Sequence, residues 1–144
     1  MTQNPRMQPT PRQSYPTLAT LEDGAFSGLL GLKVTAASEG RVSVRMPFHL
    51  RLLNHGPADV PIHGGAIASL ADFAACAAVW TMRRTERSAT ISMSINYLAP
   101  GVQSDLVANA VVRRYGKRVA SLTVEILDKQ GNLVADALIT YKVA

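Results

Sequence analysis

The chain has 144 residues, of which 47% are hydrophobic, 17% charged and 6% aromatic, with a net charge of +5 at pH 7. This length and apolar share fit a single folded domain and exclude a disordered chain. The one cysteine excludes an internal disulfide, the three histidines form no zinc-binding spacing, and the scarce aromatic and scattered basic residues argue against a nucleic-acid partner.

The first 17 residues carry four prolines among polar residues and show no hydrophobic period. They predict a flexible tail over 1–17, followed by a single domain over 18–144. The tail lacks the apolar stretch of a secretory signal, so we expect a cytoplasmic protein. From Leu18 to Gly31 the apolar residues recur at nearly helical spacing, which predicts a short first helix ended by Gly31.

Alternating apolar and polar residues over 32–46 predict a two-stranded hairpin. The loop over 49–62 is long enough to suggest a functional role. Residues 66–82 are apolar and rich in alanine, which predicts a long buried helix. A membrane span is disfavoured there because alanine is only weakly hydrophobic and Asp72 lies within the segment.

Four more strands follow, predicted by alternation and by turn residues between them, over 88–98, 105–113, 119–127 and 133–143. We expect these four strands to form a meander. Two strands, one long helix and four strands predict an α+β domain in which an antiparallel sheet wraps around a central helix.

Asp72 is the only charged residue between His63 and Arg83. An ionised carboxylate in an apolar helix is costly unless it is paired or solvated. It could face a strip of solvent or cap a nearby loop. The alternative is a functional carboxylate at the bottom of a cleft.

His63, Gly64 and Gly65 stand at the start of this helix. Backbone N–H groups at a helix N-terminus lack partners and carry partial positive charge, so they can hold a developing oxyanion. Asp72 follows Gly64 by eight residues, which is about 12 Å along a helix axis and too far for both to act on one carbonyl. A symmetric dimer could bring Asp72 of one protomer to the helix start of the other.

The segment 63–72, HGGAIASLAD, resembles the helix-start motif of hotdog-fold acyl-CoA thioesterases, in particular the PaaI-type branch of phenylacetate pathways. The likeness runs from about Gly24 to Val143 and includes the segments 96–101 and 115–118. It implies hydrolysis of acyl- or aryl-CoA thioesters to free acid and CoA. Coenzyme A is then part of the substrate, and no metal or other cofactor is expected.

The resemblance also implies roles for single residues. Asp72 would be the nucleophile or the general base, and the backbone N–H of Gly64 or Gly65 would polarise the thioester carbonyl. A small buried hydrophobe is the interpretation for Cys76, one turn after Asp72, because no histidine is placed in the sequence to activate it.

Three further positions match the family. His63 would orient the loop or help to hold the carbonyl, although a structural histidine is an equal alternative. Asn54 would contact the carbonyl or the water, but it is separated from His63 by about three more residues than in some members. Thr90 would help to place the water, unless it is an ordinary strand threonine.

Four basic residues surround a predicted turn, and the family resemblance places such residues near the nucleotide end of CoA: Arg113, Arg114, Lys117 and Arg118. Guanidinium groups suit phosphates, but a solvated hairpin tip explains them equally well. The resemblance implies a homodimer with active sites at its interface, assembling into a homotetramer, with no nucleic-acid or membrane partner.

Two other functions stay open at this point. One is a non-catalytic acyl-CoA binding module, against which the presence of Asp72 argues. The other is a hotdog enoyl-CoA hydratase or dehydratase, which would use a histidine with a carboxylate such as His63 and Asp72. The sequence does not determine the acyl group.

Overall fold

The structure, a computed structural model, describes residues 16–82 and 88–144 of the chain. Most of the predicted tail lies outside these residues. The first helix begins at Pro16, two residues before the predicted domain start. A proline fits the first turn of a helix because its missing N–H would have no partner there.

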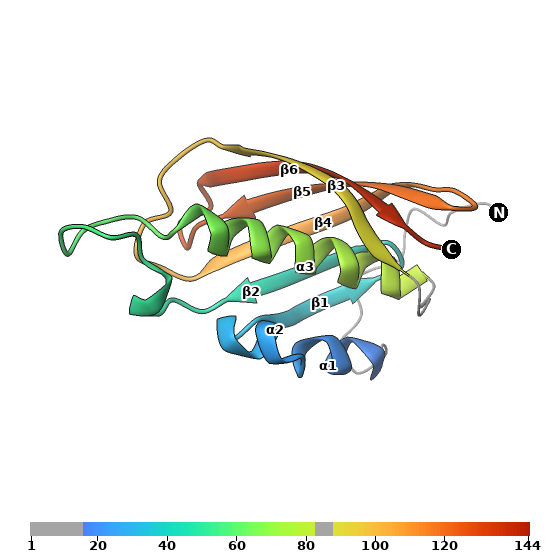
Figure 1. Cartoon of the computed structure of the whole chain (residues 1–144), viewed down its shortest axis with the longest axis horizontal. Helices are drawn as coiled ribbons and strands as arrows, with labels where there is room; N and C mark the ends of the chain where they lie inside the picture. Colours follow the sequence, from blue (N-terminus) through green and yellow to red (C-terminus); the bar gives the residue numbers. More distant parts are fainter. Residues whose placement is uncertain (1–15, 83–87) are drawn as a thin grey trace.

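Six antiparallel strands form one sheet in the order β1-β2-β4-β5-β6-β3, and the long helix α3 lies across one face of it (Figure 1). This confirms the predicted α+β architecture of a sheet wrapped around a central helix. The elements are α1 (Pro16–Glu22), α2 (Ala25–Leu30), β1 (Lys33–Ser38), β2 (Arg41–Met46), the short 3-10 helix η2 (Leu50–Leu52), α3 (Gly64–Met82), β3 (Ala89–Tyr97), β4 (Leu106–Tyr115), β5 (Val119–Leu127) and β6 (Leu133–Lys142).

The single helix expected over 18–31 is wrong, because α1 and α2 are separate helices that flank the β1 edge of the sheet (Figure 1). Gly24 has an extended backbone, with φ −57° and ψ 143°, between them. Glu22, only 2% exposed, turns inward and accepts a 2.6 Å hydrogen bond from the backbone N–H of Val34 in β1. The predicted stop at Gly31 is confirmed, with a left-handed φ of 68°.

The expected four-stranded meander is also wrong for one strand. β4, β5 and β6 do follow one another, but β3 pairs with β6 at the far edge of the sheet. Alternation of side chains identifies a strand without revealing its partner, which depends on contacts distant in sequence. β3, paired with β6, runs along one side of α3 (Figure 1).

The core lies between α3 and the sheet. Small buried side chains on α3, among them Ala71, Ala74, Ala75 and Ala78, face inward and let the helix approach the strands closely. In the described residues α3 is the one helix long and apolar enough to cross a membrane, and 56% of its apolar window is buried inside the fold. Core helices of globular domains commonly have these properties.

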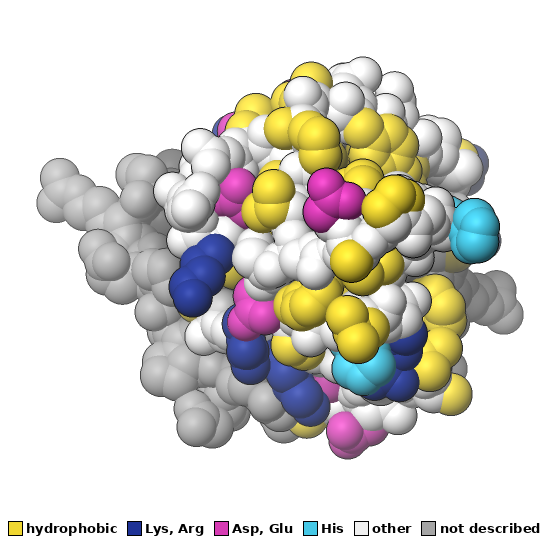
Figure 2. Space-filling view, turned by 90° about the vertical axis from the view of Figure 1, so that its left-hand side faces the viewer, with side chains coloured by type: hydrophobic (Ala, Val, Ile, Leu, Met, Phe, Trp, Pro, Cys, Tyr) yellow, Lys and Arg dark blue, Asp and Glu magenta, His cyan; other side chains and the backbone are white. Residues whose placement is uncertain are grey.

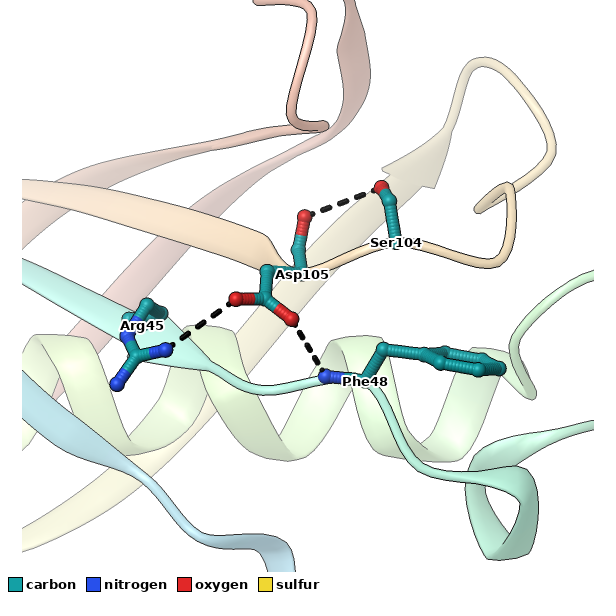
Figure 3. Close-up of polar contacts among 4 residues, drawn as sticks. All are labelled: Arg45, Phe48, Ser104 and Asp105. Carbon is teal, nitrogen blue, oxygen red and sulfur yellow. Dashed lines mark hydrogen bonds and ion pairs between the residues drawn. The ribbon is translucent and has the colours of Figure 1, made fainter.

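Asp105, just before β4, links the segment that precedes β4 to the end of β2 and the residues that follow it (Figure 3). Its carboxylate accepts a 2.8 Å hydrogen bond from the backbone N–H of Phe48 and lies 3.2 Å from the Arg45 guanidinium. The Phe48 N–H first, and then Arg45, hold the pKa of Asp105 below its ordinary value. This carboxylate therefore stabilises the fold above the pKa of the unfolded chain, about 3.9, and the contribution is lost as the pH falls through the lower folded value.

We expect Asp105→Asn to lower the free energy of unfolding at pH 7 by about 0.5–1 kcal/mol, a small effect because water screens this half-exposed pair. At pH 3 the variant and the wild type should differ less, because the carboxyl of the unfolded chain is then largely protonated and folding must release that proton. Urea unfolding at both pH values measures this. If the variant and the wild type differed equally in free energy of unfolding at pH 7 and pH 3, the stabilisation by Asp105 would not be electrostatic.

Candidate active site

Asp72 lies half-buried on α3, and its Oδ1 accepts a 2.5 Å hydrogen bond from the Thr90 hydroxyl of β3. The structure thus brings together two of the predicted site residues that are 18 positions apart. A hydrogen bond from a neutral hydroxyl supports the carboxylate and fixes its direction. Asp72 as a whole residue is only partly enclosed within one chain.

A β-bulge in β3 is what sends Thr90 toward Asp72. Opposite β6, Thr90 pairs with Tyr141 and Ser92 pairs with Thr140, so Ile91 is an extra residue in the ladder. Simple alternation would place Thr90 on the sheet face opposite to Met93. The bulge reverses this relation, and Thr90 shares the helix-facing side of β3 with Met93.

The N-terminus of α3 holds the second part of the site. The Nδ1 atom of His63 accepts a 2.8 Å hydrogen bond from the Gly65 N–H, so this imidazole caps the helix. Among the described residues, the Gly64 N–H has no such partner. The sequence left Gly64 and Gly65 as equal candidates for an oxyanion donor, and this geometry favours Gly64.

Tyr97, at the end of β3, packs on Gly64. Its hydroxyl donates a 3.0 Å hydrogen bond to the Gly64 carbonyl oxygen. A Cβ atom at position 64 would lie 3.2 Å from the Tyr97 ring, which explains a glycine at this position. Sequence reasoning did not assign Tyr97 to the site; its place at the end of a strand ahead of Pro100 and Gly101 was the available signal.

Cys76 and Trp80 lie on the same face of α3 as Asp72, one and two turns further along the helix. Burial raises the pKa of the Cys76 thiol to about 11, so at neutral pH it is protonated and a poor nucleophile. The inert thiol agrees with the predicted lack of a nucleophilic role, but Cys76 is only partly buried within one chain. Tyr141 of β6 hydrogen-bonds to Cys76, and burial first and then the nearby Cys76 raise the pKa of its phenol. The sequence indicated Tyr141 only as one alternating residue of the last strand.

An open cavity of about 360 Å³ adjoins the start of α3. It is lined by Phe26, Leu30, Arg51, Leu52, His63, Gly65, Ala66 and Ser69. Figure 2 looks onto this end of the molecule and shows hydrophobic side chains exposed among basic, acidic and histidine side chains. An open, largely apolar cavity beside polar backbone groups is typical of a small-molecule site.

The structure does not join the remaining predicted residues to the site within one chain. Asn54 lies where the 49–62 loop closes, its N–H donating 3.1 Å to the Pro61 carbonyl, and its side chain has no hydrogen bond to Asp72 in the described region. The basic cluster predicted to meet phosphates surrounds the β4–β5 hairpin. This hairpin lies at the end of the sheet opposite to the start of α3 (Figure 1).

No group of three or more metal-ligating side chains occurs in residues 16–82 and 88–144. The chemistry available to the described site consists of one carboxylate, hydroxyl groups, an imidazole used as a cap, and a helix N-terminus. A carboxylate can attack a carbonyl or activate water, and a free N–H can bind an oxyanion. These are the groups that acyl-transfer chemistry needs.

Comparison with known proteins agrees with this geometry. The profile of the thioesterase superfamily matches residues 62–135. A proposed esterase of Halobacterium salinarum is 35% identical over 118 residues, covering 80% of this chain and 74% of that protein. The acyl-coenzyme A thioesterase PaaI of Escherichia coli is 31% identical over 118 residues, covering 81% of each. Its solved structure superposes with a TM-score of 0.77 over 92% of both chains. The medium/long-chain acyl-CoA thioesterase YigI of E. coli is 32% identical over 57% of this chain and 62% of its own.

Proposed function

This chain belongs to the thioesterase superfamily, as an enzyme of its PaaI-type branch with the hotdog fold, and from this premise we propose that it hydrolyses acyl-CoA thioesters to a free acid and coenzyme A. The observation that carries the proposal for this chain is the Asp72–Thr90 pair, which holds a half-buried carboxylate in place on α3. The relatives named for acyl-CoA thioesterase activity support the substrate class.

We assign the reacting carboxylate to Asp72. As a general base it takes a proton from water while the water oxygen attacks the thioester carbonyl carbon. The carbonyl oxygen becomes an oxyanion, which the Gly64 N–H and the positive end of α3 stabilise. The C–S bond then breaks, the CoA thiolate takes the proton held by Asp72, and the acid is released.

Direct attack by Asp72 is the second route. Its carboxylate oxygen displaces the CoA thiolate and forms a mixed anhydride, which water then hydrolyses to restore the carboxylate. The two routes differ in where water oxygen first appears. In a single turnover in H₂¹⁸O, anhydride hydrolysis at the aspartyl carbon labels Asp72, whereas the general-base route labels only the released acid.

The free edge of β3 supports a homodimer. Within the described residues β3 pairs with β6 on one side, and no strand covers its other side. Ile91, on this strand, is 57% exposed. Exposed strand edges readily pair with a second chain. Two β3 strands paired antiparallel would continue the sheet and set the two α3 helices side by side.

Such a dimer would also complete the catalytic site. Along a single α3, Gly64 and Asp72 are about 12 Å apart, too far to act on one carbonyl. In an antiparallel pair of helices, Asp72 of one protomer approaches the α3 start of the other. The same two-fold relation carries the β4–β5 hairpin of one protomer to the end of the assembly where the α3 helix of the other begins. We therefore retain its four basic residues as candidates for the CoA phosphates, and a pair of such dimers as the proposed tetramer.

Thiol release from a panel of acyl-CoAs tests the function. The panel should span acetyl, medium-chain, long-chain and phenylacetyl groups, each also presented as the shorter acyl-pantetheine thioester. Thiol with matching free acid supports hydrolysis. A hydroxyacyl-CoA product from enoyl-CoA would instead indicate a hydratase, and binding without any product a non-catalytic module. If the basic cluster binds phosphates, the pantetheine thioesters should show a higher KM and a similar kcat.

A further inference from the structure

Three successive turns of α3 are joined by hydrogen bonds to residues around the start of β3 and near the end of β6. Asp72 accepts from Thr90, Cys76 bonds to Tyr141, and the Trp80 indole N–H donates 3.3 Å to the Ser88 hydroxyl oxygen. These contacts lie in a region that is otherwise an alanine-rich core. Buried polar groups in such a core are costly unless they are mutually satisfied.

Ser88 and Tyr141 link the contacts of Cys76 and Trp80 to one another. Trp80 donates its indole N–H to the Ser88 hydroxyl oxygen, and the Tyr141 side chain hydrogen-bonds to both Ser88 and Cys76. Tyr141 is 4% exposed, so water does not compete for its hydroxyl. This series of hydrogen bonds therefore fixes the residues at the start of β3 against both α3 and β6.

The anchored segment contains the bulge that directs Thr90. Ser88 lies two residues before Thr90, and Tyr141 is the cross-strand partner of Thr90 in the ladder. Ile91, the extra residue, follows directly. A bulge leaves one residue without a ladder partner, so the local register needs other contacts to stay in place. Tyr141, opposite Thr90, and Ser88, two residues before it, supply such contacts next to the bulge.

We propose that Tyr141 and Ser88 are positioning residues for catalysis, which hold the bulged start of β3 so that the Thr90 hydroxyl stays on the Asp72 carboxylate. This rests on the proposed thioesterase function of Asp72 and extends it to two residues that do not touch the substrate. Their hydroxyl groups act through Thr90. Their loss therefore changes the placement of Asp72 and leaves substrate binding alone.

A double-mutant cycle tests this coupling, with Tyr141→Phe and Thr90→Val measured singly and together. Tyr141→Phe should lower kcat by about 3- to 10-fold, the effect of one net hydrogen bond, with KM unchanged. Once Thr90 lacks its hydroxyl, the same Tyr141→Phe change should have no further effect on kcat. Urea unfolding of all four proteins shows whether each variant is folded under the assay conditions.

Ser88→Ala removes the hydroxyl that bonds to both Trp80 and Tyr141. It should lower kcat only while the Thr90 hydroxyl is present. Ser43→Ala is the matched control, because the Ser43 hydroxyl also makes one side-chain bond, 2.6 Å to Asn109, on strands remote from β3. It should leave kcat unchanged. Equal losses from Tyr141→Phe with and without the Thr90 hydroxyl, or no loss at all, would overturn the proposal. If Asp72→Asn remained fully active, the failure would instead lie with the proposed function.

Discussion

Asp72→Asn should lower kcat for the preferred acyl-CoA by at least about 100-fold, the lower limit for loss of a general base. Asparagine keeps the shape of the side chain and can still accept the Thr90 hydrogen bond through its amide oxygen. It can neither accept a proton from water nor attack a carbonyl at a useful rate. The measurement is thiol release under saturating substrate, with KM determined in parallel and expected to change little.

Asp136→Asn is the matched control for this substitution. Asp136 is also an aspartate in a regular element, and its carboxylate bonds at 3.0 Å to the Asn96 side chain across β6 and β3. It lies on the sheet face away from α3 and should retain wild-type kcat. A folded Asp72→Asn protein with more than a tenth of wild-type activity would show that another group performs the chemistry.

Loss of the β3 edge contact should have an effect of similar size. The double variant Ser92→Glu and Ser94→Glu adds four like charges across a two-fold β3–β3 junction, where directly opposed like charges are destabilising. We expect a folded monomer in sedimentation analysis, with kcat/KM lowered about 100-fold or more because the Asp72 general base no longer meets the partner's Gly64. Thr20→Glu, an exposed change on α1 at the opposite edge of the sheet, is the control and should keep both assembly and activity.

Mixing two inactive variants shows whether the site is shared. Gly64→Pro removes the backbone donor at the first position of a helix, where proline is accepted, and requires the Tyr97 ring to shift by a few tenths of an ångström. Asp72→Asn removes the carboxylate. A heterodimer of the two has one complete site if Gly64 and Asp72 come from different protomers, so activity should return on co-refolding. If each site were built within one chain, the mixture would stay inactive.

The sequence by itself was sufficient to predict α3 and the six strands and to single out Asp72, but not to separate α1 from α2. The Ala-rich run ahead of Met82 predicted α3, and alternation predicted each strand to within about two residues, because both signals are local periodicities. Asp72 was found for an equally local reason: a lone carboxylate in an apolar helix requires an explanation. The resemblance over 63–72 then indicated the family, which the comparisons confirmed.

Only the tertiary structure decided how these parts meet. The place of β3 at the sheet edge, the bulge at Ile91 and the link from Tyr141 to Cys76 are pairings between segments far apart in the chain. Strict alternation would have turned Thr90 away from Asp72, and two adjacent glycines looked equivalent until His63 was seen to occupy the Gly65 N–H. A periodic pattern shows which face of an element is buried. The register between elements, which sets the distance from hydroxyl to carboxylate, follows from packing of the whole core.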